Sequence, residues 1–251
     1  DANFGVPLGI LNGDFYETTN TPSRYIFVML FYKLPIYILF SIIFLPIVLY
    51  SKNRQKKNFK GIFYIFLQIL FPILIILTFK PGINDGLRYF LYILPFFAIL
   101  SSISIYYIFL SRFIILKFFF ISLFLYNIFI FFKLSPYQYT FINSLNGKFS
   151  NNLNKFENDY WGASIKELLL KAKNNSFFKE NKIYYISTCG VNRQIIKYYL
   201  NKEFDFEYKF VNSNEKYDYM IFVNRVDTTH GKVNLNNAKT CYDNFFKNDI
   251  I

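Results

Sequence analysis

Side chains suited to binding an anion gather in the short stretch from Lys80 to Arg88, which reads Lys-Pro-Gly-Ile-Asn-Asp-Gly-Leu-Arg. The guanidinium of Arg88 is a planar fork of donors that fits phosphate oxygens, and Lys80 is a second cation nearby. Asp85 lies close enough in sequence to orient that guanidinium. Two interpretations stay open: a site for a lipid-linked phosphate, or a plain turn with an ion pair between Asp85 and Arg88, which spacing alone favours.

The chain has two cysteines, Cys189 and Cys241, and one histidine, His230. Neither metal-ligand spacing nor a catalytic Cys-His pair is present, so the sequence indicates no metal site, and we expect no catalytic task for the histidine. The cysteines form either a disulfide or two separate thiols. The turn from Cys189 to Asn192 lacks the glycine spacing that brings a backbone close to a pyrophosphate, so a nucleotide site is not supported.

The elements that must position these groups are strongly apolar. Hydrophobic residues make up 53% of the chain and aromatic residues 23%, with the excess in the first half, which is too apolar for an ordinary soluble domain. Runs long enough to cross a hydrocarbon core of about 30 Å are expected to be helices, because an open strand in lipid would leave its backbone unpaired. Four such runs cover residues 25–50, 61–79, 89–110 and 113–132.

Basic residues predict the orientation of these four helices. The segment between the first two runs contains Lys52, Arg54, Lys56, Lys57 and Lys60, which the positive-inside rule places in the cytoplasm. Residues 1–24, the loop from 80 to 88 and everything after residue 133 are then extracytoplasmic, while Lys117 snorkels to the inner interface. The net charge of +12 favours lipid headgroups over nucleic acid as a partner, since no nucleic-acid-reading motif accompanies it.

From Ser135 onward the composition becomes rich in Asn, Lys, Glu and Asp, which indicates a water-exposed domain over residues 133–251. The spacing Ser164-Ile-Lys-Glu167 predicts a capping box that opens a helix through about Lys173. Strand, helix and strand patterns follow in that order, which favours a small α/β layer with a parallel pair of strands. The predicted strands are 182–188, 206–211 and 218–223, and the predicted helix is 191–200.

Several blocks of sequence resemble the C-terminal portion of bacterial glycosyltransferase family 39, which is related to protein O-mannosyltransferases and aminoarabinose transferases. On physical grounds alone, the tyrosines after residue 135 and the aromatics of 160–161 form an interfacial aromatic belt. The resemblance rests on these stretches in the family's order: Asn84 to Pro95, Ser135 to Tyr139 with Phe141 and Asn143, Asp159 to Glu167, and more weakly Thr21, Pro22 and Tyr25.

The resemblance implies a helical membrane bundle of the GT-C type followed by a small extracytoplasmic α/β domain. It implies a bacterial inner-membrane enzyme that moves a sugar from a polyprenyl-phosphate donor to an acceptor at the outer face, with inversion. Arg88 would then hold the lipid phosphate, with Lys80 as a second cation and Asp85 as an orienting partner. No cofactor is required by the resemblance, although a divalent metal stays open as a partner for the phosphate charge.

Two departures from the family pattern limit what carries over. Relatives often have His where this chain has Tyr89 and Ser135. The family's acidic catalytic residue lies in a first outward loop that this chain lacks, and its role does not transfer to Asp1, Asp14 or Asp85, so the catalytic residue is unknown. We therefore expect a fragment that is inactive alone. A non-catalytic, membrane-anchored binding or assembly module is the alternative, and a transporter is disfavoured because intramembrane charges are scarce.

Overall fold

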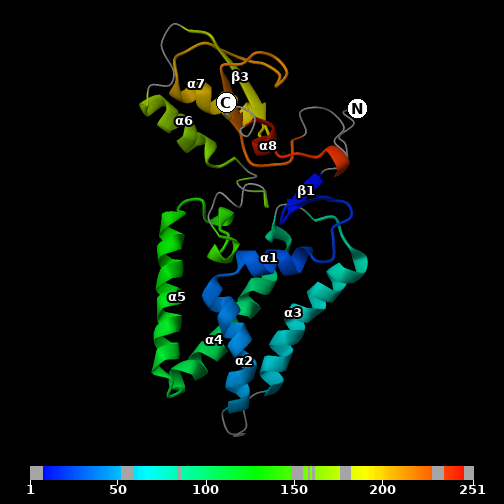
Figure 1. Ribbon diagram of the computed structural model, residues 1–251, viewed down its shortest axis with the longest axis vertical. Coiled ribbons are helices and arrows are strands. Elements are labelled where there is room, and N and C mark those ends of the chain that lie inside the picture. Colours follow the sequence, from blue (N-terminus) through cyan, green and yellow to red (C-terminus); the bar gives the residue numbers. More distant parts are fainter. Residues whose placement is uncertain are drawn as a thin grey trace. The chain divides into compact units, whose positions relative to one another are not determined.

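The computed structural model describes residues 8–51, 59–83, 86–147, 155–157, 159, 162–175, 182–227 and 235–245. The chain divides into two compact units. Residues 19–148 form one, here called the helical unit, and residues 1–18 with 149–251 form the other, here called the α/β unit. Figure 1 shows the elements of both units.

The helical unit consists of membrane-type helices. Helices over Lys60–Phe79, Arg88–Leu110 and Ile114–Lys133 are long and apolar enough to cross a membrane. Length and composition thus support the predicted bundle. The helices of this unit are α1 (Tyr25–Lys33), α2 (Ile36–Ser51), α3 (Phe59–Phe79), α4 (Leu94–Leu110) and α5 (Ile114–Lys133), with short 3-10 helices η1 (Arg88–Ile93), η2 (Gln138–Thr140) and η3 (Ser144–Asn146).

The predicted first span, residues 25–50, is divided into two helices. The axes of α1 and α2 differ by 110° (Figure 1). The break lies at Leu34, which has the extended values φ −77° and ψ 141°, because the residue before a proline is pushed out of the helical region. Pro35 causes this, whereas Pro46 is accommodated inside α2. At nine residues, α1 is too short to cross a bilayer by itself.

Polar and aromatic contacts hold α2 against its neighbours. A hydrogen bond of 2.7 Å joins the hydroxyls of Ser41 on α2 and Ser101 on α4, and both side chains are buried. Small residues at this crossing let the two backbones approach closely. On the α5 side, the rings of Phe40 and Phe119 meet edge to face at 5.5 Å. In lipid, apolar burial alone gives little preference for one packing of helices over another, so contacts of these kinds matter more there.

The α/β unit is built on a parallel sheet of three strands in the order β4-β3-β5. The predicted strand-helix-strand order and parallel pairing are confirmed, and β5 (Tyr219–Phe222) adds a second parallel neighbour. Apolar side chains of two helices, α6 and α7, and of the sheet form one core. The other elements are β3 (Tyr184–Cys189), β4 (Tyr208–Phe210), α6 (Ile165–Asn174), α7 (Arg193–Glu203), η5 (Leu235–Asn237) and α8 (Cys241–Phe245).

An N-terminal hairpin also belongs to the α/β unit. Strands β1 (Leu8–Leu11) and β2 (Asp14–Glu17) pair antiparallel around an Asn-Gly turn whose two residues have positive φ, as such tight hairpins require. The fully buried Leu11 forms a bridge with Phe156. This long-range pairing cannot be read from local periodicity, and the sequence had indicated only a separate segment over residues 1–24.

The predicted capping box at the start of α6 is wrong. The side chain of Ser164 makes no capping hydrogen bond. The carboxylate of Asp159 accepts the backbone N–H groups of Ala163 at 2.9 Å and of Ser164 at 3.1 Å instead. A carboxylate satisfies these donors and also complements the helix dipole. Glu167 forms an exposed ion pair with Lys171 at 2.7 Å.

Candidate functional site

The described part of the loop after α3 is anchored by apolar side chains. Lys80 ends the helix in the left-handed conformation, with φ 43°, and its N–H donates to the carbonyl of Ile76 at 2.9 Å, as in αL helix ends. Ile83 and Leu87 are buried, whereas the Lys80 side chain is exposed. Asp85 lies outside the described residues, so the structure does not test its predicted pairing with Arg88.

The segment leading into α1 fixes this loop. The N–H of Ile83 donates to Thr21 Oγ1 at 2.9 Å, and the hydroxyl of Tyr25 donates to the carbonyl of Gly86 at 3.0 Å. The side chains of Thr21 and Tyr25 are both buried. Two stretches that carried the family resemblance, some sixty residues apart, therefore meet here. Their contact fixes the backbone on both sides of residues 84 and 85.

Arg88 lies at the exposed start of η1 and is oriented by its neighbour. Its Nη2 donates to the hydroxyl of Tyr89 at 2.6 Å, and its guanidinium carbon lies 4.7 Å from the centre of the Tyr89 ring. A hydrogen bond and a cation–π contact together hold the guanidinium in one place. Tyr89 thus orients the guanidinium of Arg88.

An apolar groove of about 510 Å³ runs between α1, α2, α3 and α4. Among its described lining residues none is charged. Leu77 lies three residues before Lys80, or about 5 Å along the helix, and Phe27 follows Tyr25 closely. On α3, the described lining of the groove thus comes within three residues of Lys80. The groove is lined by residues that include Leu30, Ile42, Leu74 and Phe97.

The Ser135–Asn143 stretch has a role that the sequence did not indicate. The buried Asn143 donates from Nδ2 to the carbonyls of Phe31 at 2.6 Å and Leu34 at 2.9 Å. These carbonyls lie at the end of α1, where the break at Pro35 removes their helical donors. Asn143 is thus a clamp on the end of α1, whereas the interfacial belt predicted for the tyrosines of this stretch stays a prediction. Because Asn143 lies 109 residues after Leu34 in the chain, no local sequence signal indicated this contact.

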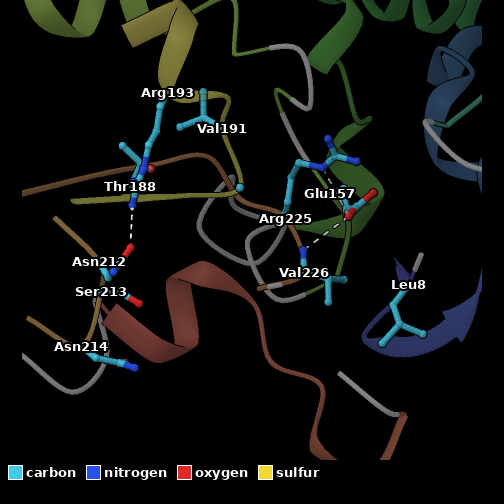
Figure 2. A pocket seen from close by; sticks show the side chains of 11 residues that line it. Leu8, Glu157, Thr188, Val191, Arg193, Asn212, Ser213, Asn214, Arg225 and Val226 are labelled. Carbon is cyan, nitrogen blue, oxygen red and sulfur yellow. Dashed lines mark hydrogen bonds and ion pairs between the residues drawn. The ribbon is translucent and has the colours of Figure 1, made fainter. Parts of the chain in front are cut away.

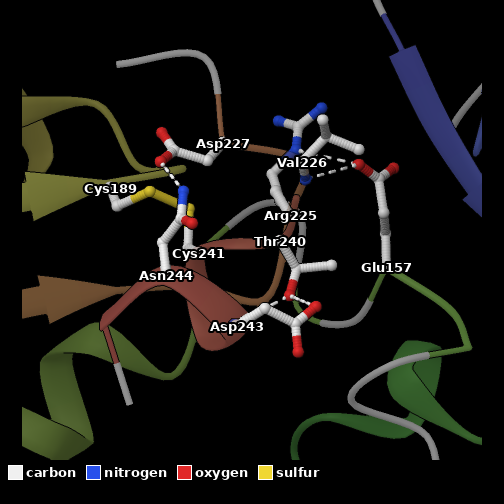
Figure 3. The surroundings of a disulfide bond; sticks show 9 residues. All are labelled: Glu157, Cys189, Arg225, Val226, Asp227, Thr240, Cys241, Asp243 and Asn244. Carbon is white, nitrogen blue, oxygen red and sulfur yellow. Dashed lines mark hydrogen bonds and ion pairs between the residues drawn. A yellow bond between two sulfur atoms is a disulfide. The ribbon is translucent and has the colours of Figure 1, made fainter. Parts of the chain in front are cut away.

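Cys189 and Cys241 are joined by a disulfide, with their Cα atoms 5.8 Å apart (Figure 3). Together with Asp227 they form a buried group whose possible ligand atoms lie within 4.8 Å of one another. The sulfurs are bonded to each other, and the Asp227 carboxylate accepts a hydrogen bond from Asn244 at 2.6 Å. In this oxidised form the group offers no thiolate to a metal ion.

Comparisons of the chain with protein-family models, with curated proteins and with solved structures give no match.

Proposed function

We propose that this chain is the C-terminal part of a membrane glycosyltransferase that takes a sugar from a polyprenyl-phosphate donor. The acceptor receives it at the outer face of a bacterial inner membrane. The proposal is supported by an uncharged groove in the helical unit whose lining includes Leu77, three residues before Lys80, and by the exposed cations Lys80 and Arg88 on the segment that follows α3. A polyprenyl phosphate has the complementary form, a long apolar chain that ends in an anionic headgroup.

In the transfer, an acceptor hydroxyl attacks the anomeric carbon of the sugar, and the bond from that carbon to the phosphate oxygen breaks. The electron pair leaves with the lipid phosphate, and the acceptor's proton passes to a carboxylate base, which these residues do not identify. Arg88 binds the phosphate and stabilises its increasing negative charge. Lys80 adds a second positive charge, and Asp85 orients the guanidinium. A divalent metal is the other group able to neutralise a departing phosphate.

The test is sugar transfer to acceptor in membranes that contain the full-length protein, normalised to the amount of folded protein. Arg88→Ala should reduce transfer by about a hundredfold, the usual effect of removing one charge-stabilising donor. Arg112→Ala is the matched control, because it removes the same charge from the exposed turn between α4 and α5, and it should transfer normally. Unchanged transfer by Arg88→Ala would exclude that residue from the site.

The alternative, a non-catalytic membrane-anchored binding module, is favoured by one feature. The α/β unit contains a polar pocket of its own, of about 770 Å³. A binding module would retain lipid-phosphate and pocket ligands without transferring sugar. Transfer by the full-length protein that depends on Arg88 decides against this alternative.

A further inference from the structure

A second candidate site lies at the carboxyl edge of the parallel sheet in the α/β unit (Figure 2). The pocket, of about 770 Å³, is lined by residues that follow each of the three strands, among them Gly190, Asn212 and Arg225. From β3 the chain passes to β4 on one side and then to β5 on the other. Parallel sheets bind ligands where the strand order reverses in this way. The volume is in the range of small-molecule sites.

Arg193 supplies a fixed positive charge on one side of this pocket. It lies in the first turn of α7 and donates from Nη2 to the carbonyl of Val211 at 2.9 Å and from Nε to Thr188 Oγ1 at 3.3 Å. These bonds join β3, α7 and the segment after β4. Figure 2 shows Arg193 directed toward Thr188 and Asn212.

Arg225 supplies positive charge on another side of the pocket. Its Nε lies 3.8 Å from Glu157 Oε1, and the arginine side chain is about one-third exposed. A contact of this length is a weak ion pair rather than a strong hydrogen bond. Arg225 thus lines the pocket beside Glu157 and adds a second positive charge to that of Arg193. The described lining has two arginines against one carboxylate, so its net charge is positive.

The shape of this edge is fixed before any ligand binds. Gly190 has φ +70°, and a Cβ there would lie 2.9 Å from the Val223 carbonyl and 3.2 Å from both Arg225 Cβ and Cys241 Sγ. Only glycine allows the turn after β3 to approach so closely. The N–H of Cys241 also donates to the Arg225 carbonyl at 2.9 Å. The disulfide therefore holds the backbone of Arg225 against the pocket (Figure 3).

We infer that this pocket binds a small, hydroxylated anion of the sugar-phosphate or sugar-acid class, with Arg225 contacting its charged group. The amides of Asn212 and Asn214 and the hydroxyl groups of Thr188 and Ser213 contact its hydroxyls. The described lining contains no aromatic side chain, so nothing there stacks on a nucleobase. The pocket lies wholly within the α/β unit, and its binding is independent of the proposed transfer reaction.

Calorimetric titration of the purified full chain tests this inference, with glucose 6-phosphate, glucuronate, glucose and inorganic phosphate as probes. At least one of the two sugar anions should bind with a Kd of about 1 mM or tighter, and glucose should not bind. Which of the two binds more tightly distinguishes a phosphate from a carboxylate ligand. Absence of binding by both sugar anions would overturn the inference. If inorganic phosphate bound as tightly as glucose 6-phosphate, the proposed contacts with the sugar hydroxyls would be overturned.

Two substitutions with opposite expected signs assign the binding to this pocket. Arg225→Gln should weaken the preferred sugar anion at least tenfold, whereas Glu157→Gln should tighten it, because it removes the carboxylate that competes for Arg225. Lys197→Gln, on the exposed face of α7, is the control and should bind normally. If Arg225→Gln does not fold, Arg225→Lys keeps the charge and should retain most binding. Equal affinity in Arg225→Gln and Glu157→Gln would place the ligand elsewhere.

Discussion

The two units of this chain place the same kinds of side chain in opposite environments. In the helical unit large apolar side chains point outward, and Phe118 and Phe129 of α5 are 65% and 63% exposed. In the α/β unit Ile186, Ile196 and Leu200 are fully buried. Water drives the second arrangement through the hydrophobic effect. Three helices of the helical unit are long and apolar enough to cross a membrane, and in lipid, where apolar burial gives no such preference, helices associate through close packing and polar contacts.

The comparison also explains where the candidate binding groups lie. In the helical unit Arg88 begins η1, and Asn143 donates to a carbonyl near the end of α1, where backbone groups lose their helical partners. In the α/β unit the candidate groups lie where parallel strands end, as Arg193 and Arg225 do. In both units the candidate binding groups Arg88, Arg193 and Arg225 thus lie close to the ends of regular elements. The following predictions test whether the two units are stabilised as differently as their exposed surfaces indicate.

The largest expected effect is the loss of the disulfide from the α/β unit. Replacing Cys189 and Cys241 together by Ser opens a loop of 52 residues, which the chain-entropy model values at about 4 kcal/mol. The free energy of unfolding of this unit, from urea-dependent proteolysis, should fall by roughly that amount. A reducing agent should lower the free energy of unfolding of the parent chain toward that of the variant, and it should leave the stability of the variant unchanged. If the helical unit became equally sensitive to protease, the two units would not be independent.

A matched pair of truncations compares the two solvents directly. Leu200→Ala in the buried core should cost about 3 kcal/mol, through lost burial and the cavity that remains. Phe129→Ala removes a larger side chain from the exposed face of α5, yet should cost under about 1 kcal/mol in a bilayer. The stability loss of each variant is measured in lipid nanodiscs by its rate of proteolysis and its helix content. Equal costs would show that α5 has a protein partner on that face.

The clamp on α1 should show that the helical unit depends on polar contacts. Asn143→Ala leaves the carbonyls of Phe31 and Leu34 without the amide and should cost about 2 kcal/mol, the usual cost of an unsatisfied buried group. Resistance of the chain to heat-induced aggregation in detergent is the measurement. Ser102→Ala, which removes only a hydroxyl bonded within α4 to Ala98, is the control. A loss as large in the control would mean that the clamp has no special role.

Much of the fold was predictable because it follows from local pattern. Three apolar runs and the parallel strands appear where composition and periodicity predicted them. The break before Pro35 was missed because one apolar run continues through it, and only its backbone geometry shows the bend. Asp159 displaced the predicted cap because a carboxylate several residues upstream folds back onto the helix. The local spacing of residues does not predict contacts that form when the chain folds back on itself.

The candidate sites were predictable to different degrees. The loop with Lys80 and Arg88 was identifiable because its charged residues are close in sequence. The pocket of the α/β unit was not, because Arg193 and Arg225 lie on either side of a long stretch of chain and meet only when the strands align. The turn at Gly190 lacks the glycine spacing of a nucleotide site. Its real constraint is the close approach of Arg225 and the disulfide.

The smallest expected effect concerns an exposed ion pair at the edge of the sheet. The Asp218 carboxylate accepts hydrogen bonds from Lys182 Nζ at 2.8 Å and from the Tyr185 N–H at 2.9 Å. The bond from Lys182, followed by that from Tyr185, lowers the pKa of Asp218. A carboxyl whose pKa is lower in the folded state stabilises that state above its unfolded pKa of about 3.9, and this contribution is lost as the pH falls through the folded pKa.

Acid should therefore weaken the α/β unit slightly through Asp218, and Asp218→Asn should remove that part of the pH dependence. Because both side chains are exposed and solvent screens their interaction, the shift in urea midpoint between pH 6 and pH 3 should be smaller than the effects predicted above. Asp205→Asn, at another exposed aspartate of the same unit, should leave the acid dependence due to Asp218 in place. An identical acid response in Asp218→Asn and the parent chain would show that the sheet edge gains nothing from this pair, and would leave the apolar core and the disulfide as the main sources of stability in the α/β unit.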